Sequence, residues 1–180
     1  MPTVMTHALV PLAAGLMLGG GRVPPRVIVA GMVLAMLPDA DVIGFRLGIE
    51  YGDAWGHRGA SHSLVAAAVV GTLVALLLRP ERKISAAIFL FCAMASHGLL
   101  DTLTNGGLGA ALLWPFSEAR IHASFTPIAV SPIGISNFIS ARGLSVLASE
   151  ARWVWLPCLL GVGLAFSIRR LTSSSAKGSS

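Results

Sequence analysis

Five apolar segments, separated by short polar breaks, take up most of this chain and restrict it to one class of fold. They run over Val4–Gly20, Val27–Phe45, Ser63–Leu78, Ile84–Leu103 and Trp153–Ile168. Only 12% of the 180 residues are charged, against about 25% in soluble domains, so too little polar surface remains to cover a water-soluble globule. We therefore predict an all-α fold, a polytopic transmembrane helical bundle of about five spans. Several segments are shorter than the ~20 residues of a full span, so tilted or partial spans are expected.

The segment between the last two apolar stretches, residues 104–151, is rich in Gly, Ser and Pro but contains apolar runs at Ala110–Phe116 and Phe125–Ile139. It is predicted to be a partly re-entrant or interfacial loop with room for a sixth short helix. No basic stretch precedes the first apolar segment, so this segment is expected to stay in the membrane rather than be cleaved as a signal peptide. Residues 1–171 should form a single transmembrane domain, and the Ser-rich residues 172–180 a disordered tail.

The basic residues predict how the chain is oriented in a cell (inner) membrane. With five spans, 8 of the 13 Lys and Arg residues fall in short segments on one side. These are Arg22, Arg26, Arg79, Arg82, Lys83, Arg169, Arg170 and Lys177. By the positive-inside rule that side is cytoplasmic, which places the N-terminus outside and the C-terminus inside. No basic stripe with interleaved aromatic residues occurs, so nucleic acid is not an expected partner.

Histidines and aspartates gather on one face of the membrane when the spans alternate in direction, and the predicted topology makes this face extracytoplasmic. They are His7, Asp39, Asp41, His57, His62, His97 and Asp101. An ionisable group at membrane depth costs roughly a few kcal/mol, so a cluster of them needs compensation. A divalent cation supplies it, because imidazoles and carboxylates replace the water around the ion while the ion neutralises the acids.

Two short motifs have the spacing expected of metal ligands. His97 and Asp101 are four residues apart, so on a helix both side chains lie on one face and can chelate one ion. Asp39 and Asp41 follow Pro38 at the end of the second apolar segment, where the helix dipole disfavours negative charge unless a cation is bound. At most one of them points inward if the helix continues. Asp39 is the preferred ligand, and Asp41 is a candidate second ligand or general base.

Residues 57–63 form the densest polar patch of the chain. Ser61 is the predicted N-cap of the third helix, which puts His62 in the first turn, where the dipole favours a neutral imidazole. Gly59 permits a tight return, so that His57 and His62 can reach one centre.

Five further residues are assigned by their surroundings. Arg58 is a candidate contact for a phosphate group of the substrate. His7 is assigned to the metal site because it lies on the shared face. His122, in the long loop, has no partner at a telling spacing and is placed outside the site. Cys92 and Cys158 lie in apolar runs without a CxxC pair and are interpreted as packing residues.

Taken together, these motifs resemble the YdjM-like family of membrane-bound, metal-dependent hydrolases. The likeness rests on Thr6-His7, Leu37–Asp41, His57–Ser63, Ser96–Asp101 and Thr104–Gly107, within residues 1–116. The resemblance implies metal-dependent hydrolysis. The order of the histidines and aspartates is also similar to part of the ligand order of zinc-dependent phospholipase C. This chain has too few histidines for that enzyme's full set of zinc ions, so one or two ions are expected.

These observations predict a hydrolase that cleaves a phosphoester of a membrane lipid or lipid-linked substrate at the outer membrane interface. One or two divalent ions, with zinc favoured over manganese or magnesium, would be bound by histidine and aspartate. The candidate ligands are His7, Asp39, His57, His62, His97 and Asp101. The metal would lower the pKa of a bound water to about 7, with Asp41 as general base and Arg58 as phosphate contact. The oligomeric state stays open.

Three other functions fit parts of the same pattern. A divalent metal-ion transporter or channel would use the cluster as a transit site, but it predicts ionisable residues on both sides of the membrane midplane. A serine hydrolase would pair Ser61 or Ser63 with His97, although no nucleophile-elbow motif is present. A non-catalytic assembly protein would bind a structural metal with closed coordination.

Overall fold

The computed structural model describes residues 1–19, 21–132 and 138–177, and the regular elements of these residues are all helical. The α-helices are α1 (Val4–Leu18), α2 (Pro25–Met36), α3 (Leu64–Leu78), α4 (Lys83–Thr102), α6 (Ala141–Glu150) and α7 (Leu156–Lys177). Two 3-10 helices, η1 (Leu37–Leu47) and η2 (Ala60–His62), and a π-helical turn, η3 (Ala151–Trp155), accompany them. The predicted all-α fold is confirmed.

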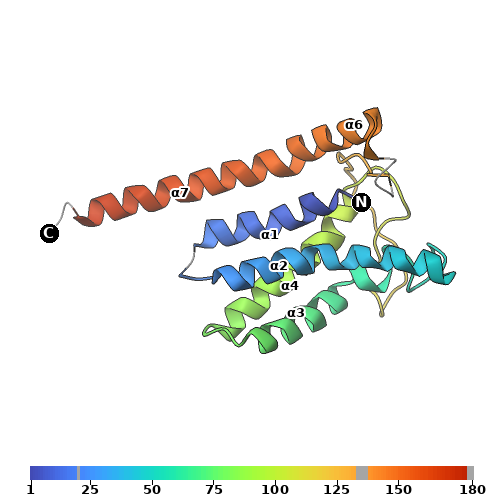
Figure 1. Cartoon of the computed structure of the whole chain (residues 1–180), viewed down its shortest axis with the longest axis horizontal. Coiled ribbons are helices and arrows are strands. Elements are labelled where there is room, and N and C mark those ends of the chain that lie inside the picture. The colour runs from blue at the N-terminus through green and yellow to red at the C-terminus, as the bar shows by residue number, and fades with distance from the viewer. Residues whose placement is uncertain (20, 133–137, 178–180) are drawn as a thin grey trace.

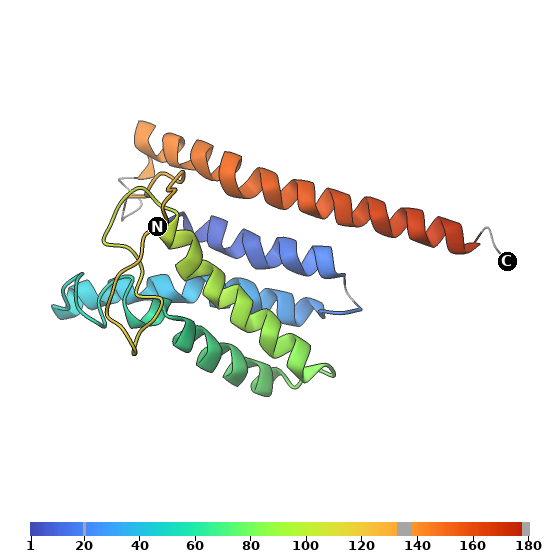
Figure 2. The same ribbon diagram turned by 180° about the vertical axis from the view of Figure 1, so that it is seen from behind.

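Helices α1, α2, α3 and α4 form a bundle, and α7 packs along α1 (Figure 1). α2 continues directly into η1, while α6, η3 and α7 form one long helix that projects beyond the bundle (Figure 2). The α1–α2 and α3–α4 turns, with residues 21–26 and 79–83, make up the basic end of the bundle. The opposite end, the loop end, is built from η1, η2 and the segment that follows α4.

Glycines allow the bundle helices to approach closely. A Cβ on Gly71 of α3 would lie 2.8 Å from the backbone nitrogen of Phe91 in α4, and a Cβ on Gly31 of α2 would lie 2.7 Å from the ring of Phe89. Small residues at helix contacts are typical of membrane bundles, where packing rather than the hydrophobic effect holds the helices together. These contacts hold α4 between α2 and α3.

Within the described residues, three helical segments are long and apolar enough to cross a membrane: Pro25–Leu47, Lys83–Thr102 and Ala141–Ser173. Helices α1 and α3 are apolar but have 15 residues each, fewer than the ~20 of a full span. Large apolar side chains face outward, such as Leu77, which is 80% exposed, and Ile84, which is 78% exposed. Each predicted apolar segment overlaps one of the α-helices α1, α2, α3, α4 and α7, and three helical segments of the described residues reach spanning length.

The last helix begins earlier than the sequence predicts, at Ala141 instead of Trp153. Ser140 is its N-cap, because the serine side chain accepts a hydrogen bond from the backbone nitrogen of Gly143. The Gly and Ser residues of this part of 104–151 made it resemble a loop in the sequence.

At its far end the same helix extends into the Ser-rich segment. α7 continues through residues 172–177, where the sequence predicts a disordered tail. Residues 178–180, and residues 133–137 of the long loop, lie outside the described residues.

Glu150, fully buried where α6 meets η3, ties the last helix to the start of α1. Its carboxylate accepts hydrogen bonds from Thr3 N at 2.5 Å, Thr3 Oγ1 at 2.7 Å and Thr6 Oγ1 at 2.6 Å. Trp155 Nε1 donates to the same Thr6 hydroxyl at 2.7 Å. A carboxylate is favourable at a helix N-terminus, because the dipole and the free N–H groups attract negative charge. These bonds fix the turn of α1 that carries His7.

Candidate metal centre

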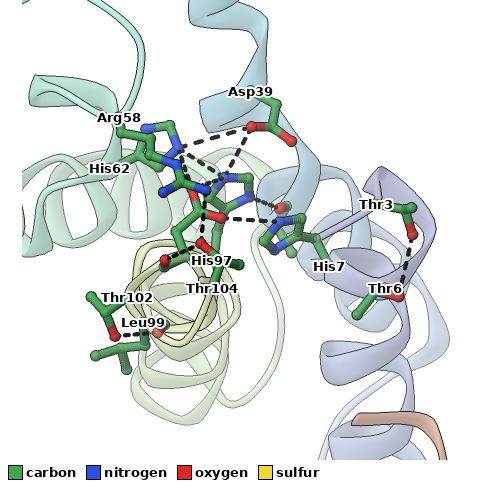
Figure 3. A network of polar contacts seen from close by, with 12 residues as sticks. Thr3, Thr6, His7, Asp39, Arg58, His62, His97, Leu99, Thr102 and Thr104 are labelled. Atoms are coloured by element: carbon green, nitrogen blue, oxygen red, sulfur yellow. Dashed lines mark hydrogen bonds and ion pairs between the residues drawn. The ribbon is translucent and has the colours of Figure 1, made fainter. Parts of the chain in front are cut away.

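Five buried residues from α1, η1, η2 and α4 converge at the loop end of the bundle. They are His7, Asp39, His62, His97 and Asp101. Each side chain is 6% exposed or less. Figure 3 shows His7, Asp39, His62 and His97 directed toward one another. The structure thus brings together five of the residues that the sequence assigned to one face.

His97 presents a single ring nitrogen to this cluster. Its Nδ1 lies 2.7 Å from the carbonyl oxygen of Ala35 in α2. Because a carbonyl oxygen can only accept, Nδ1 carries the proton and the neutral ring keeps a lone pair on Nε2. A backbone carbonyl on the far nitrogen is a typical second contact of a metal-binding histidine.

His62 is oriented in a similar way by Ser61 and Asp41. Ser61 Oγ donates to Asp41 Oδ2 at 2.7 Å and lies 3.0 Å from His62 Nδ1. The hydroxyl proton is committed to the carboxylate, so Ser61 Oγ accepts from Nδ1, and Nε2 of the neutral ring keeps a lone pair. This nitrogen faces Nε2 of His97 at 2.9 Å. Two lone pairs at this separation repel each other unless a proton or a metal ion lies between them.

The carboxylates of Asp39 and Asp101 complete the group. Asp39 Oδ1 lies 3.3 Å from His97 Nε2, and Asp101 Oδ2 lies 3.2 Å from His62 Nε2. Within the described residues, no carboxylate oxygen of Asp39 or Asp101 has a hydrogen-bond partner. Arg58 Nε, 3.2 Å from Asp101 Oδ2, offsets the charge of Asp101, whereas Asp39 has no ion pair with Lys or Arg among the described residues. A buried carboxylate without compensation costs several kcal/mol, so Asp39 requires further positive charge nearby.

The ligand atoms of Asp39, His62, His97 and Asp101 fit a divalent metal ion, and all lie within 4.8 Å of one another. Four ligands at about 2.0–2.1 Å from a tetrahedral zinc ion are about 3.3 Å apart. The distances from the two histidines to each other and to the two carboxylates run from 2.9 to 3.9 Å. The two carboxylates carry two negative charges toward a divalent ion, one of which Arg58 offsets through Asp101. We call these residues the four-residue group.

His7 lies beside the four-residue group rather than within it. Its ring stacks on that of His97 with centroids 3.7 Å apart, and its Nε2 is 3.8 Å from Asp101 Oδ1. Both ring nitrogens are buried without a hydrogen-bond partner in the described structure. A buried imidazole without partners is available to a metal ion, a water molecule or a proton.

Asp41 and His57 form a second, adjoining group with His62. Asp41 Oδ1 lies 2.7 Å from His57 Nδ1, and Oδ2 lies 3.2 Å from His62 Nδ1. Unlike the two carboxylates of the four-residue group, Asp41 has hydrogen-bond partners for both oxygens. These contacts favour a role in orienting the two histidines over the general-base role expected from the sequence.

The helical path of η1 directs two aspartates that are close in sequence toward different partners. After Met36 the α-helix narrows to a 3-10 helix, which has about 3.0 residues per turn. Side chains two positions apart then point about 120° apart. Asp39 therefore reaches the four-residue group while Asp41 reaches His57 and Ser61.

Arg58 is fully buried, and its guanidinium is engaged inside the protein. Nε lies 3.2 Å from Asp101 Oδ2, while Nη1 and Nη2 each donate at 3.0 Å, to Gly106 O and Thr104 Oγ1. These contacts fix Asp101 and the loop after α4. They leave little of the guanidinium for the substrate phosphate expected from the sequence.

The N-cap of α3 is Ser63, so the prediction of Ser61 is wrong by two positions. Ser63 Oγ accepts a hydrogen bond from Ala66 N at 3.0 Å, and His62 precedes the helix instead of lying in its first turn. Neither serine hydroxyl is hydrogen-bonded to His97, the pairing that a serine hydrolase requires.

His62 lies outside the membrane-spanning helices, and its pKa is raised. Burial lowers the pKa of this imidazole, but its contacts with the carboxylates of Asp101 and Asp41 outweigh that effect. A proton and a metal ion therefore compete for the nitrogen that faces the four-residue group.

A mostly apolar cavity of about 380 Å³ opens beside Asp39 at the loop end. Its lining includes Pro2, Val4, Met5, Val42, Pro132 and Phe138. Among the described residues of this lining, Asp39 is the only acidic one. Val4 is 44% exposed and Met5 59% exposed at the rim. Cavities of this kind bind the apolar part of a ligand and orient it through a few polar groups.

The remaining positions show what the sequence could not reveal. His122 is exposed and lies 3.3 Å from Gly107 O, away from the cluster, as expected. The carbonyl of Ala35 orients His97 but has no signature in the sequence, because every residue carries the same group. Ser61 was noticed, although as a helix cap rather than as the link between Asp41 and His62.

Comparison with known proteins places the chain among inner membrane proteins. A family model described as "YdjM inner membrane protein" matches residues 1–173. Inner membrane protein YbcI of Escherichia coli (strain K12) is 46% identical over 173 residues, which cover 94% of this chain and 100% of that protein. No solved structure matches the chain. The family match extends into the last helix, beyond the motifs at residues 1–116.

Proposed function

The chain belongs to the YdjM family of inner membrane proteins, and we propose that it is a membrane-embedded, metal-dependent hydrolase that cleaves a phosphoester of a lipid or lipid-linked substrate. One observation carries the proposal: a buried group of metal-binding side chains shares Asp39 with an apolar cavity. The group supplies a site for a cation, and the cavity supplies a place for the apolar part of an amphiphilic substrate.

Zinc is the proposed cofactor, held by the four-residue group, because mixed imidazole and carboxylate donors suit it better than magnesium. When bound, it supplies a water of lowered pKa and positive charge near the developing anion. Asp39, whose Oδ1 is 3.9 Å from His62 Nε2, would hold the ion on the side of the group that borders the apolar cavity, so water and substrate would approach it from there.

The surrounding residues are proposed to act by positioning and by proton transfer. Asp41, through Ser61, holds His62 with Nε2 directed inward, and Arg58 holds Asp101. His7, with both ring nitrogens free of hydrogen bonds, is the proposed acceptor of the proton from the attacking water.

The proposed topology has five spans, with the N-terminus outside, the C-terminus in the cytoplasm and the loop end on the extracytoplasmic side. The concentration of arginines at the basic end supports this orientation. The short helices α1 and α3 are accommodated by local thinning of the bilayer. The site then lies at the level of the phosphate groups of the outer lipid leaflet.

The proposal is tested by incubating the purified, zinc-loaded chain with a membrane lipid extract and following phosphorus-31 NMR signals. We expect a new phosphate-containing product with the wild type and none with Asp101→Asn. Asp53→Asn is the matched control, because Asp53 is an exposed acid of the same end whose carboxylate bonds only to Glu50 N. A wild type that binds zinc stoichiometrically but releases no product would leave a structural metal site as the better explanation.

A metal-ion transporter is the rival from another functional class. Both groups of metal-binding residues in the described structure lie at the loop end, whereas a transit path needs a second site toward the basic end. Zinc flux through proteoliposomes, without any hydrolysis, would favour the rival.

A further inference from the structure

A cavity of about 330 Å³ lies at the basic end, between the α1–α2 turn and the α3–α4 turn. Its charged lining consists of Arg22, Arg26, Arg82 and Glu81. The three arginines and one acid leave an excess of positive charge in a confined space. The cavity lies at the opposite end of the bundle from the metal centre (Figure 1).

In the part of the chain that the structure describes, the three guanidinium groups have no protein partners. Within the described residues, no ion pair or side-chain hydrogen bond involves Arg22, Arg26 or Arg82, in spite of the nearby Glu81. Arg169 behaves differently, since it donates to the last carbonyl groups of α1 at 3.0 and 3.1 Å. Three cations around one cavity outnumber its single acid, Glu81, and attract an anion. The first turns of α2 and α4, which begin here, carry no acidic residue.

A second cavity, of about 390 Å³, adjoins the first and shares Arg22 and Arg82 with it. Its other lining residues include Leu18, Val23 and Ile88. Leu18 is 42% exposed and Ile88 58% exposed on the outer surface of the bundle, where lipid chains lie in a membrane protein. A cationic cavity therefore continues into an apolar one.

We propose that this pair of cavities binds an anionic phospholipid. The headgroup phosphate lies among Arg22, Arg26 and Arg82, and the first part of an acyl chain lies against Leu18 and Ile88. Arginine forks match phosphate oxygens, and basic pockets between membrane helices bind anionic headgroups. The positive-inside rule accounts for arginines at this end of the bundle. It does not account for a cavity in which these arginines adjoin an apolar surface. This inference does not depend on the proposed hydrolase activity.

The test uses the purified full chain in detergent, equilibrated with equal amounts of phosphatidylglycerol and phosphatidylcholine of identical acyl chains. Native mass spectrometry then counts the lipids that stay bound. We expect one preferred phosphatidylglycerol, and a loss of affinity of about tenfold or more in Arg22→Gln/Arg82→Gln, because charged hydrogen bonds to phosphate are removed. Ile88→Trp, which fills the apolar cavity and keeps every charge, should also weaken retention of the lipid.

The matched control is Arg79→Gln/Arg170→Gln, which removes two charges from exposed positions that line neither cavity. Its affinity for phosphatidylglycerol should stay within about twofold of the wild-type value. An equal loss of affinity in both double variants would show that general attraction to the positive surface, not the cavity, binds the lipid. Competition by inorganic phosphate alone would overturn the lipid assignment in favour of free phosphate, and equal binding of both lipids would overturn the site. Circular dichroism confirms that each variant keeps its helices.

Discussion

The carboxylate of Asp41 shows how a residue outside the four-residue group controls its geometry. It contacts Nδ1 of His57 directly and reaches His62 through Ser61. Carboxylates on the far nitrogen of a metal-binding histidine fix its tautomer and raise its basicity. The two aspartates thus have different roles. Asp39 supplies a candidate ligand atom, and Asp41 orients the histidines.

Replacing Asp41 by Asn should therefore weaken metal binding rather than abolish it. Loss of this kind of contact typically lowers metal affinity by about 10–100-fold. The measurement is competition against a chromogenic zinc chelator, and excess zinc should restore hydrolysis in the variant. Unchanged affinity together with lost turnover would identify Asp41 as the general base after all.

Replacing His7 is predicted to lower hydrolysis and to leave metal binding unchanged. Because it lies beside the four-residue group, His7→Ala should keep the metal but lose roughly 10²–10⁴-fold in hydrolysis, the typical contribution of a general base. Zinc content and turnover are measured on the same preparation. Loss of zinc in this variant would instead make His7 a ligand.

Helix contacts of the bundle set the distances within the metal centre, because α4 carries two of its residues. Gly71→Ala on α3 would place a Cβ 2.8 Å from Phe91 N, and this backbone cannot yield without moving α4. We expect a loss of stability of about 1–3 kcal/mol, typical of overpacking. Unfolding in mixed micelles measures it.

The control for this variant is Gly163→Ala in α7, where an added Cβ meets nothing within 4 Å. It should be neutral or slightly stabilising, because Ala favours the helix over Gly. Equal stability of the two variants would contradict the close approach of α3 and α4.

Features that depend on the spacing of residues within one helix could be predicted from the sequence. Features that depend on contacts between distant segments could not. The spacing of His97 and Asp101 places both side chains on one face of a helix, and α4 presents them in that way. The narrowing of η1 after Met36 has no comparable signal, so the contacts of Asp41 with His57 and Ser61 became visible only in the structure. The start of the last helix was missed because its buried charge, Glu150, is satisfied by threonines far away in the sequence.

At the scale of the whole molecule, the two ends of the bundle have different chemistry. Alternation of the apolar segments correctly predicted that distant histidines and aspartates would meet at one end. It could not predict the cavities, because these depend on how the loops after α4 and around η1 pack. The orientation in the membrane stays a proposal based on the basic residues.

That orientation can be tested with two exposed acids at opposite ends, Glu118 and Glu81. In a background with Cys92 and Cys158 replaced by Ala, Glu118→Cys should react with a membrane-impermeant maleimide in intact spheroplasts. Glu81→Cys should react only after the membrane is permeabilised. The reverse pattern would place the metal centre on the cytoplasmic side.

The central claim is that the four-residue group holds a metal ion, and elemental analysis of the purified chain tests it most directly. Wild type and Asp53→Asn, prepared without chelator, should each contain about one zinc ion per chain, as expected for a single four-ligand site. Asp101→Asn should contain almost none while keeping its helical circular dichroism. A well-folded wild type without metal, or equal metal in all three proteins, would contradict the account.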